Sequence, residues 1–424
     1  MNIMQVNPKM GDTTARRPGL WLPLGLLFAS ALPDAMVVPV LHDLMVVRYG
    51  VSPAASHAFM CINLVGAILV IGLIGRLRQL GTSGSPGKII AVAALVNALL
   101  LALMALPIGF SLTLFVRFLE GAADLIVYAF LFDYLAKAGP NESKGQRMGA
   151  AATCLMLGIA TGIGLGGWIG SINPVFALWI GAISCLFVAP IALQIRTIVV
   201  GESSNETTAD SQSQPSLRGP LWPSLVMMFS DRAVVGVLIS TVPLFLASRA
   251  GLSSGEIGSL IGVSMLMTAL GAWPAGRLSD RIGPLRLRLF AGLVYAIAFA
   301  SIVFTAMEST TMLACAMLAF GIAGAALFAS SLMTVVQSGL GPSGMAAYHT
   351  SGNLGFLLGP VCAGLTLKYF GGPGIGVYVA IIGGTALMHA ISTTIVLFGT
   401  SLAWRRLKMP PSDDAELATD LASS

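Results

Sequence analysis

The sequence predicts an all-α membrane protein in which twelve transmembrane helices form two six-helix pseudo-repeats. Of its 424 residues, 56% are hydrophobic and 10% are charged, whereas soluble proteins carry about 25% charged residues. Apolar stretches of roughly 20 residues, the length that crosses a hydrocarbon core of about 30 Å as a helix, follow one another along the chain. Landmarks of the first half also recur in the second half at a nearly constant offset.

The first six apolar stretches are expected to be helices because lipid offers the backbone no hydrogen-bond partners, and a helix satisfies its own backbone. Polar residues, glycines and prolines separate these stretches and set their approximate ends. The expected spans are 19–41, 57–77, 88–109, 111–136, 148–170 and 173–196.

The second set of six stretches begins after a polar segment, GESSNETTADSQSQPSLRGP, which has no apolar period and is typical of a solvated linker. Its expected spans are 221–247, 256–276, 287–306, 311–337, 346–368 and 374–401. The chain is therefore divided into a tail (1–18), a first half (19–200), a linker (201–220), a second half (221–403) and a C-terminal tail (404–424).

Basic residues lie mostly on one side of the predicted membrane. Of the 23 Lys and Arg residues, 18 fall in the two tails and in every second loop, and basic loops tend to stay in the cytoplasm. Both termini are therefore expected to be cytoplasmic, in the inner membrane of a bacterium. The net charge of +5 follows from this topology, so no nucleic-acid partner is expected.

No cofactor, metal site or enzymatic centre is indicated. The five cysteines lie within spans without CxxC or Cys/His spacing, and the four histidines are scattered. No P-loop and no Ser/His/Asp or HExxH arrangement stands out. Ala29-Ser30-Ala31 resembles a signal-peptide cleavage site, but apolar sequence continues to Leu41, long enough to span the membrane.

The internal repeat appears as glycines at matching places in the two halves. Parallel repeats of this kind are typical of transporters that rock one half against the other around a site at the membrane midplane. The matching pairs are Gly50 and Gly251 (201 apart), Gly75 and Gly276 (201), Gly121 and Gly324 (203), and Gly162 and Gly359 (197).

The loop after the eighth span, Gly276 to Gly283 (GRLSDRIG), followed by Arg286, resembles the GxLaDrxGrk loop of the major facilitator superfamily. That resemblance covers nearly the whole chain and implies the major facilitator fold. Asp280 could accept charge-assisted bonds from a neighbouring Arg such as Arg281, which would latch one conformation. A plain positively charged loop is the alternative, and the first-half copy at 75–81 lacks the Asp and one residue.

The fourth span contains Arg117-Phe118-Leu119-Glu120-Gly121, which resembles the family's RxxqG motif, whose arginine is associated with proton coupling. Glu120 replaces the usual amide, and Asp124 follows one turn later, so that Arg117, Glu120 and Asp124 share one helical face. Ionisable groups in lipid cost several kcal/mol, so they are expected to face a partner or a wet cavity. A structural salt bridge is the alternative.

The fifth span contains Gly158, Gly162, Gly166 and Gly167 and resembles the antiporter motif GxxxGPxxGG, although Ile163 replaces the proline. The eleventh span keeps that proline, in Gly355, Gly359 and Pro360. Small residues four apart let helices pack closely, so a plain packing face explains the pattern equally well. No strand precedes these glycines, which argues against dinucleotide binding.

Asp34 lies in the first span between Pro33 and Pro39, and this stretch resembles the first helix of drug:proton antiporters. The prolines leave carbonyls unpaired and loosen the helix where a substrate could approach. Asp231 and Arg232, in the seventh span, are adjacent and expected to point to different sides of the helix; an interhelical ion pair is the alternative for both acids. Weaker polar candidates are Asn63, Asn97, Gln337, His349, Asn353 and His389.

The leading hypothesis is a secondary exporter of a small amphipathic molecule, driven by protons entering through Asp34, Glu120 or Asp124. Burial disfavours the charged form of a carboxylate, so such a group can hold a proton and release it when its cavity opens. The chain would act as a monomer in the bilayer. The alternatives are an importer of a metabolite or organic anion, with Arg117 or Arg232 as anchor, and a non-transporting membrane subunit.

Overall fold

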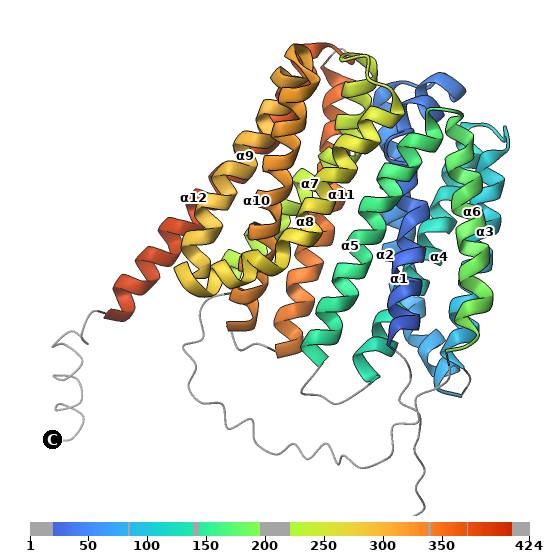
Figure 1. The fold of residues 1–424 in the computed structure, drawn as a ribbon, viewed down its shortest axis with the longest axis horizontal. Helices are drawn as coiled ribbons and strands as arrows, with labels where there is room; N and C mark the ends of the chain where they lie inside the picture. The colour runs from blue at the N-terminus through green and yellow to red at the C-terminus, as the bar shows by residue number, and fades with distance from the viewer. Residues whose placement is uncertain are drawn as a thin grey trace, which may run out of the picture.

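The computed structural model describes residues 20–83, 85–138, 144–195, 221–337, 341–370 and 372–408, and the predicted tail 1–18 and linker 201–220 lie outside these ranges. The C-terminal tail was predicted to begin at 404, but residues 404–408 still belong to the last helix, and only 409–424 lie outside the described ranges. The described residues form twelve α-helices and one short π-helix, and no strand (Figure 1). They are α1 (Trp21–Met36), η1 (His42–Val47), α2 (Pro53–Ser83), α3 (Pro86–Ala105), α4 (Phe110–Lys137), α5 (Lys144–Gly170), α6 (Pro174–Ala192), α7 (Trp222–Ser248), α8 (Ser254–Ile282), α9 (Pro284–Glu308), α10 (Thr310–Gln337), α11 (Gly341–Tyr369) and α12 (Ile375–Lys408).

The predicted all-α membrane class is confirmed, and each predicted span overlaps one helix. Within the described ranges, nine of the helices are long and apolar enough to cross a membrane, while α1 is apolar but only 16 residues long. Large hydrophobic side chains cover the outside of the bundle, among them Leu99 (68% exposed), Phe187 (66%) and Phe290 (72%). Exposed apolar surface of this extent is expected only where lipid covers it.

Several helix ends differ from the predicted spans because prolines and caps decide them. The third span was expected to reach 109, but α3 ends at Ala105, since a residue before proline, here Leu106, avoids the helical region. Helix α8 begins two residues earlier than expected, at a capping box formed by Ser253 and Glu256. It ends at Ile282, six residues beyond the expected 276, because Gly283 with its φ of 89° caps it.

The first helix ends early for the same kind of reason. Pro39 has no N–H to donate to Ala35, and the Val38 N–H bonds to the Ala35 carbonyl at 3.2 Å instead. The chain then passes through a turn and into the π-helix η1, so the first span is an α-helix only as far as Met36.

The same helix pairs pack in both sets of six. In the first set α1 packs on α5 and α6, α3 packs on α4 and α6, and α2 packs on α4. In the second set the corresponding helices, numbered six higher, pack in the same way: α7 on α11 and α12, α9 on α10 and α12, and α8 on α10. We call the end of the bundle that carries Leu20, Ile195 and Leu221 the linker end, and the opposite end the far end. Odd-numbered helices run from the linker end to the far end.

The two sets meet through α5 with α8 and through α2 with α11. Toward the far end, a Cβ on Gly258 of α8 would lie 2.7 Å from the Gly167 Cα of α5, so the two backbones are in direct contact. In Figure 1 the second set leans away from the first toward the linker end, at the bottom of the view.

Two side-chain hydrogen bonds add to this contact between the sets. Ser254 Oγ donates to the Asp43 carboxylate (2.5 Å), which joins α8 to η1. The His57 Nε2 and Thr241 Oγ1 atoms are 2.9 Å apart, which joins α2 to α7. The far end is thus the closed end of the molecule.

Candidate functional site

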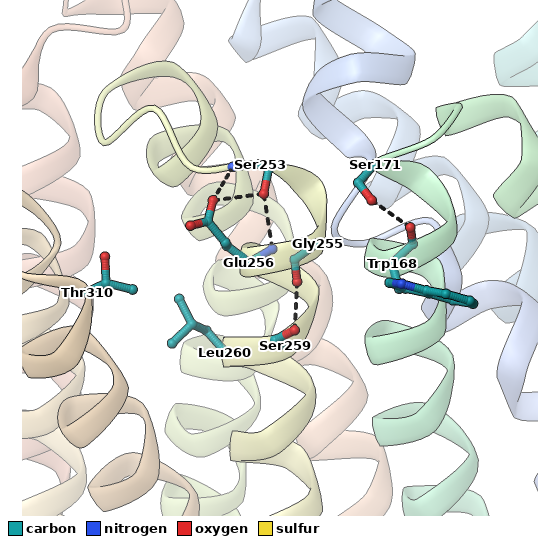
Figure 2. A pocket seen from close by; sticks show the side chains of 8 residues that line it. All are labelled: Trp168, Ser171, Ser253, Gly255, Glu256, Ser259, Leu260 and Thr310. Atoms are coloured by element: carbon teal, nitrogen blue, oxygen red, sulfur yellow. Dashed lines mark hydrogen bonds between the residues drawn. The ribbon is translucent and has the colours of Figure 1, made fainter.

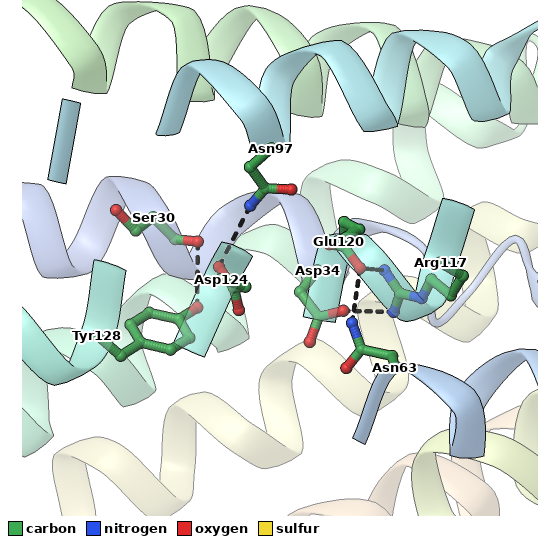
Figure 3. Close-up of polar contacts among 8 residues, drawn as sticks. All are labelled: Ser30, Asp34, Asn63, Asn97, Arg117, Glu120, Asp124 and Tyr128. Atoms are coloured by element: carbon green, nitrogen blue, oxygen red, sulfur yellow. Dashed lines mark hydrogen bonds and ion pairs between the residues drawn. The ribbon is translucent and has the colours of Figure 1, made fainter. Parts of the chain in front are cut away.

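Charged side chains from α1 and α4 meet inside the first set of helices, around Arg117 (Figure 3). One guanidinium nitrogen donates to Glu120 Oε2 (2.7 Å), and the other donates to Asp34 Oδ1 of α1. Asn63 of α2 donates to the same Glu120 oxygen at 2.6 Å. The guanidinium carbon also lies 4.9 Å from the centre of the Phe59 ring, a cation–π contact. We call Asp34, Asn63, Arg117 and Glu120 the arginine cluster.

Glycines bring α2 and α4 close enough for these bonds to form. A Cβ on Gly66 would lie 1.9 Å from the Phe118 carbonyl oxygen, and one on Gly121 would lie 2.0 Å from the Asn63 carbonyl oxygen. The two backbones are therefore in contact on either side of Glu120. The i, i+3 spacing of Arg117 and Glu120 then directs both side chains to the same face of α4.

A second acid lies two turns along α4 from Arg117. Asp124 accepts a hydrogen bond from Asn97 of α3 at 3.4 Å, and Tyr128, one turn further, donates to the Ser30 carbonyl of α1 at 3.1 Å (Figure 3). Asp124 is 7% exposed and Asn97 is 2% exposed. This acid therefore has amide and phenol neighbours where Glu120 has a cation.

Two carboxylates thus bond to one guanidinium in a buried place, and a third, that of Asp124, acts on it electrostatically from two turns along α4. Arg117 is 1% exposed and Glu120 is fully buried, whereas the Asp34 side chain is 40% exposed. With all groups ionised, the negative charges exceed the positive charge by two. A buried excess of negative charge is costly, so these side chains are held under electrostatic strain.

Asp231 and Arg232 lie on α7 in the other set, and the sequence-based expectation that they point apart is wrong. Arg232 Nε is 3.4 Å from Asp231 Oδ2, an ion pair between adjacent residues. Neighbouring Cβ atoms diverge by about 100° on a helix, but the Arg232 side chain is long enough to bend back toward Asp231. Both remain partly exposed, at 14% for Asp231 and 20% for Arg232.

The polar residues that were weaker candidates for the site differ in their surroundings. Asn63 and Asn97 hold the acids of α4, as described above. His349 and Asn353 are exposed on α11, and His389 is fully buried on α12. The side chain of Gln337 lies outside the part that the structure describes.

The loop motif lies at the linker end, where α8 passes into α9. Asp280, Arg281 and Arg286 are exposed, and within the described ranges Asp280 makes no ion pair. Gly276 has open space around it, and Gly283 provides the turn. Most side chains of the first-half copy at 75–81 lie outside the described part of the chain.

The motif glycines of α5 and α11 lie against other helices. Gly158, Gly162 and Gly166 face the Phe28, Leu32 and Met36 carbonyls of α1. In the second set Gly355 and Gly359 face the Phe229 and Ala233 carbonyls of α7, and Pro360 lies against Gly236 of α7. Gly167 alone turns to the other set, against α8.

A surface hollow of about 420 Å³ lies at the far end between α5, α8 and α10 (Figure 2). Its polar groups already bond locally: Glu256 accepts from the Ser253 N–H (2.9 Å), and Ser171 Oγ donates to the Trp168 carbonyl (2.6 Å). The hollow lies away from the arginine cluster. The described part of the chain also holds no group of three His, Cys, Asp or Glu residues that could bind a metal.

Sequence reasoning missed Phe59, Gly66 and Tyr128 as parts of the site. Each lies on a helix face that packs inward, and nothing in the residue types distinguishes them from ordinary packing residues. Asn63 was a weak candidate because its partner, Glu120, is on another helix 57 positions away. The spacing of polar residues within one span cannot reveal such a pairing.

A family model described as Major Facilitator Superfamily matches residues 24–346. An uncharacterised MFS-type transporter of Yersinia pestis is 25% identical over 370 residues, which cover 84% of this chain and 90% of the relative. The uncharacterised MFS-type transporter YcaD of Escherichia fergusonii is 26% identical over 319 residues, covering 74% and 79%.

Two solved structures share the fold. The nucleoside transporter NupG superposes with a TM-score of 0.67 at 14% identity, covering 90% of this chain and 98% of that one. A bacterial homologue of the human lysosomal transporter Spinster, in an inward-facing and unoccupied conformation, gives a TM-score of 0.69 at 15% identity, covering 91% and 96%.

Proposed function

We propose that this chain, which belongs to the Major Facilitator Superfamily and is an integral membrane transporter, exports a small amphipathic molecule in exchange for protons. One observation carries the proposal. Two carboxylates, those of Asp34 and Glu120, bond to the guanidinium of Arg117, and Asp34 is both the most exposed member of the arginine cluster and the one that α1 contributes.

We assign the binding of the transported proton to Asp34. A proton on Asp34 removes one of the two anionic partners of Arg117 and leaves Glu120 as the other, so the ion pair within α4 persists. The charge-assisted bond between α1 and α4 is weakened in that state. Substrate and proton then compete for the partly exposed Asp34, which is the arrangement that an exchanger needs.

The closed far end and the absence of an Asp280 ion pair within the described ranges support an inward-facing state, as in the Spinster homologue, whose structure is named inward-facing. This assignment takes the linker end as cytoplasmic, from the distribution of basic residues. In the opposite state the linker end closes, and Asp280 is then placed to bond with Arg side chains there, as a latch.

The second candidate is an importer of a metabolite or organic anion. Arg232 is its better anchor, because it is 20% exposed, whereas Arg117 is buried and already has two acidic partners. The similarity to a nucleoside transporter, at 14% identity, concerns the fold.

Everted membrane vesicles test the proposal directly. A pH gradient is imposed, acidic inside, and reported by a fluorescent amine while single compounds are added, starting with lipophilic cations such as ethidium. An exchanger dissipates the gradient when its substrate is added, and vesicles with Asp34→Asn protein do not respond. If no compound dissipates the gradient, while intact cells accumulate a metabolite or organic anion only when the chain is expressed, the molecule is an importer.

A further inference from the structure

A buried histidine in the second set of helices has no role in the mechanism above. His389, on α12, is fully buried, and in the described part of the chain neither ring nitrogen makes a hydrogen bond of good geometry, although the Ser230 backbone of α7 is close enough to interact with the ring. A buried polar group without a well-formed hydrogen bond is rare in folded proteins and indicates a missing proton, water or ligand. An apolar side chain would stabilise the fold more than an imidazole at such a buried position.

Other ionisable groups gather around this ring. The Asp231 carboxylate of α7 acts on His389 electrostatically, and the Tyr295 ring of α9 lies 5.0 Å from it, centre to centre. Tyr295 is itself close enough to interact with the Asp231 carboxylate. Three helices thus bring an acid, a phenol and an imidazole together.

This group is not a copy of the arginine cluster. The repeat offset of 203 that relates Gly121 to Gly324 places Phe320 opposite Arg117 and Ala323 opposite Glu120. Phe320 stacks on Tyr295, with ring centres 4.2 Å apart, so the second set has aromatic packing where the first set has its ion pair. Its ionisable groups come instead from α7, α9 and α12.

We propose that Asp231 and His389 form a second proton-binding site, in the half of the molecule that lacks the arginine cluster. The carboxylate stabilises a charged imidazole, and Tyr295 bridges the two as a hydroxyl donor and acceptor. Asp231, 14% exposed, gives the site a route to water. No bond other than those to the proton changes.

Neighbouring charges set the affinity of this site. Arg232 contacts Asp231 at 3.4 Å and opposes protonation of the pair. On α11, His349 is exposed and Tyr348 is buried; on α9, Arg288 is buried and donates to the Ser330 carbonyl at 2.9 Å. A shift of Arg232 away from Asp231 would therefore load the site with a proton.

The inference extends the proposed proton coupling, but its test needs no substrate. Protein labelled with [15N]histidine is placed in lipid nanodiscs, and the ring nitrogens are followed by solid-state NMR between about pH 5 and pH 9, around the usual histidine range. His389→Gln assigns the signal. His349→Gln, the same change at an exposed histidine, is the matched control and leaves the His389 signal in place.

The His389 ring should bind a proton within this range. Its midpoint should move to lower pH by about one unit in Asp231→Asn and to higher pH in Arg232→Gln, because each variant removes one neighbouring charge. Asp34→Asn should leave the midpoint unchanged. A ring that stays neutral throughout in both wild type and Arg232→Gln overturns the proposal, as does a midpoint that follows Asp34 as closely as Asp231.

If His389 does not titrate, the result of the vesicle assay is unaffected, because that assay reports how proton movement is coupled to transport through Asp34. Conversely, if no compound dissipates the gradient in vesicles, the proposed exchange function is ruled out, but the titration of His389 can still be measured. The two failures are therefore distinguishable.

Discussion

Among single residues, Asp34 is the one whose substitution should abolish the coupling of transport to the proton gradient without abolishing transport itself. Asp34→Asn keeps the size and the partial exposure of the side chain but cannot bind and release a proton. We expect gradient-driven accumulation to fall to the level of vesicles without the protein, while downhill exchange of the same compound persists. Transport of a radiolabelled compound, with and without a pH gradient, measures both.

Glu120→Gln is the matched comparison, because it changes a buried acid in the same cluster to the amide more usual in the family. It should impair coupling less than Asp34→Asn, since Asn63 and Arg117 can still bond to the amide oxygen. Membrane levels must be equal, because loss of a buried ion pair can itself destabilise by about 3–5 kcal/mol. Full coupling in Asp34→Asn, with loss in Glu120→Gln, would move the proton site to α4.

Asn63 is expected to hold Glu120 in place. Asn63→Leu keeps the volume but removes the donor 2.6 Å from Glu120 Oε2, so a fully buried carboxylate loses one of its two hydrogen bonds. The free energy of unfolding should fall by about 1–3 kcal/mol. Thermal unfolding in detergent measures this, and Asn353→Leu, at an exposed asparagine, should leave the midpoint nearly unchanged.

Among the helices, α5 depends on glycine at some positions and not at others. A Cβ on Gly162 would lie 2.5 Å from the Leu32 carbonyl oxygen and 2.9 Å from the Ala35 Cβ, whereas one on Gly164 meets nothing within 4 Å. Gly162→Ala should therefore push α1 away from α5 and lower stability by about 1–3 kcal/mol. Gly164→Ala, two residues along the same helix, should be neutral in the same unfolding assay, and equal effects would contradict this packing.

The helices themselves could be predicted from the sequence because span length and apolarity are set by the bilayer. Their ends were less predictable. Pro39 ends α1 early and Leu106, before a proline, ends α3, but the capping box at Ser253 and Glu256 extends α8 outward. The pairing of Arg117 with Glu120 follows from spacing on one helix, whereas its bond to Asp34 depends on the packing of α1 against α4.

For the whole molecule, the distribution of basic residues makes a prediction about orientation. Reporter fusions at Gly201 and Ser424 should both report cytoplasm, because 18 of the 23 basic residues fall on the side that these positions share. Each position is fused in turn to alkaline phosphatase, which is active only outside the cytoplasm, and to green fluorescent protein, which fluoresces only inside it. An exported signal at either position would rule out an arrangement of twelve spans with both termini inside.

The contact between the two sets of helices leads to a prediction about the conformational cycle. Gly258→Val adds a side chain where a Cβ alone would lie 2.7 Å from the Gly167 Cα and from the Ile163 carbonyl oxygen. The far end should then be unable to close, and transport should stop although each half stays folded. Gly255→Ala, on the same helix, is the control, because its Cβ would meet Ser171 only at 3.6 Å, an ordinary contact.

A cysteine at position 36 reports the state of the far end. Met36 is 1% exposed and lies in the same core cluster as Ile257 and Ile261, so a membrane-impermeant maleimide should reach Met36→Cys only when the far end opens. With the five native cysteines replaced, labelling from the far side should be low in the wild type and in Gly255→Ala and high in Gly258→Val. If Gly258→Val transports normally and shields position 36 as the wild type does, the glycine contact does not close the far end, and the two cross-set hydrogen bonds would have to hold it shut.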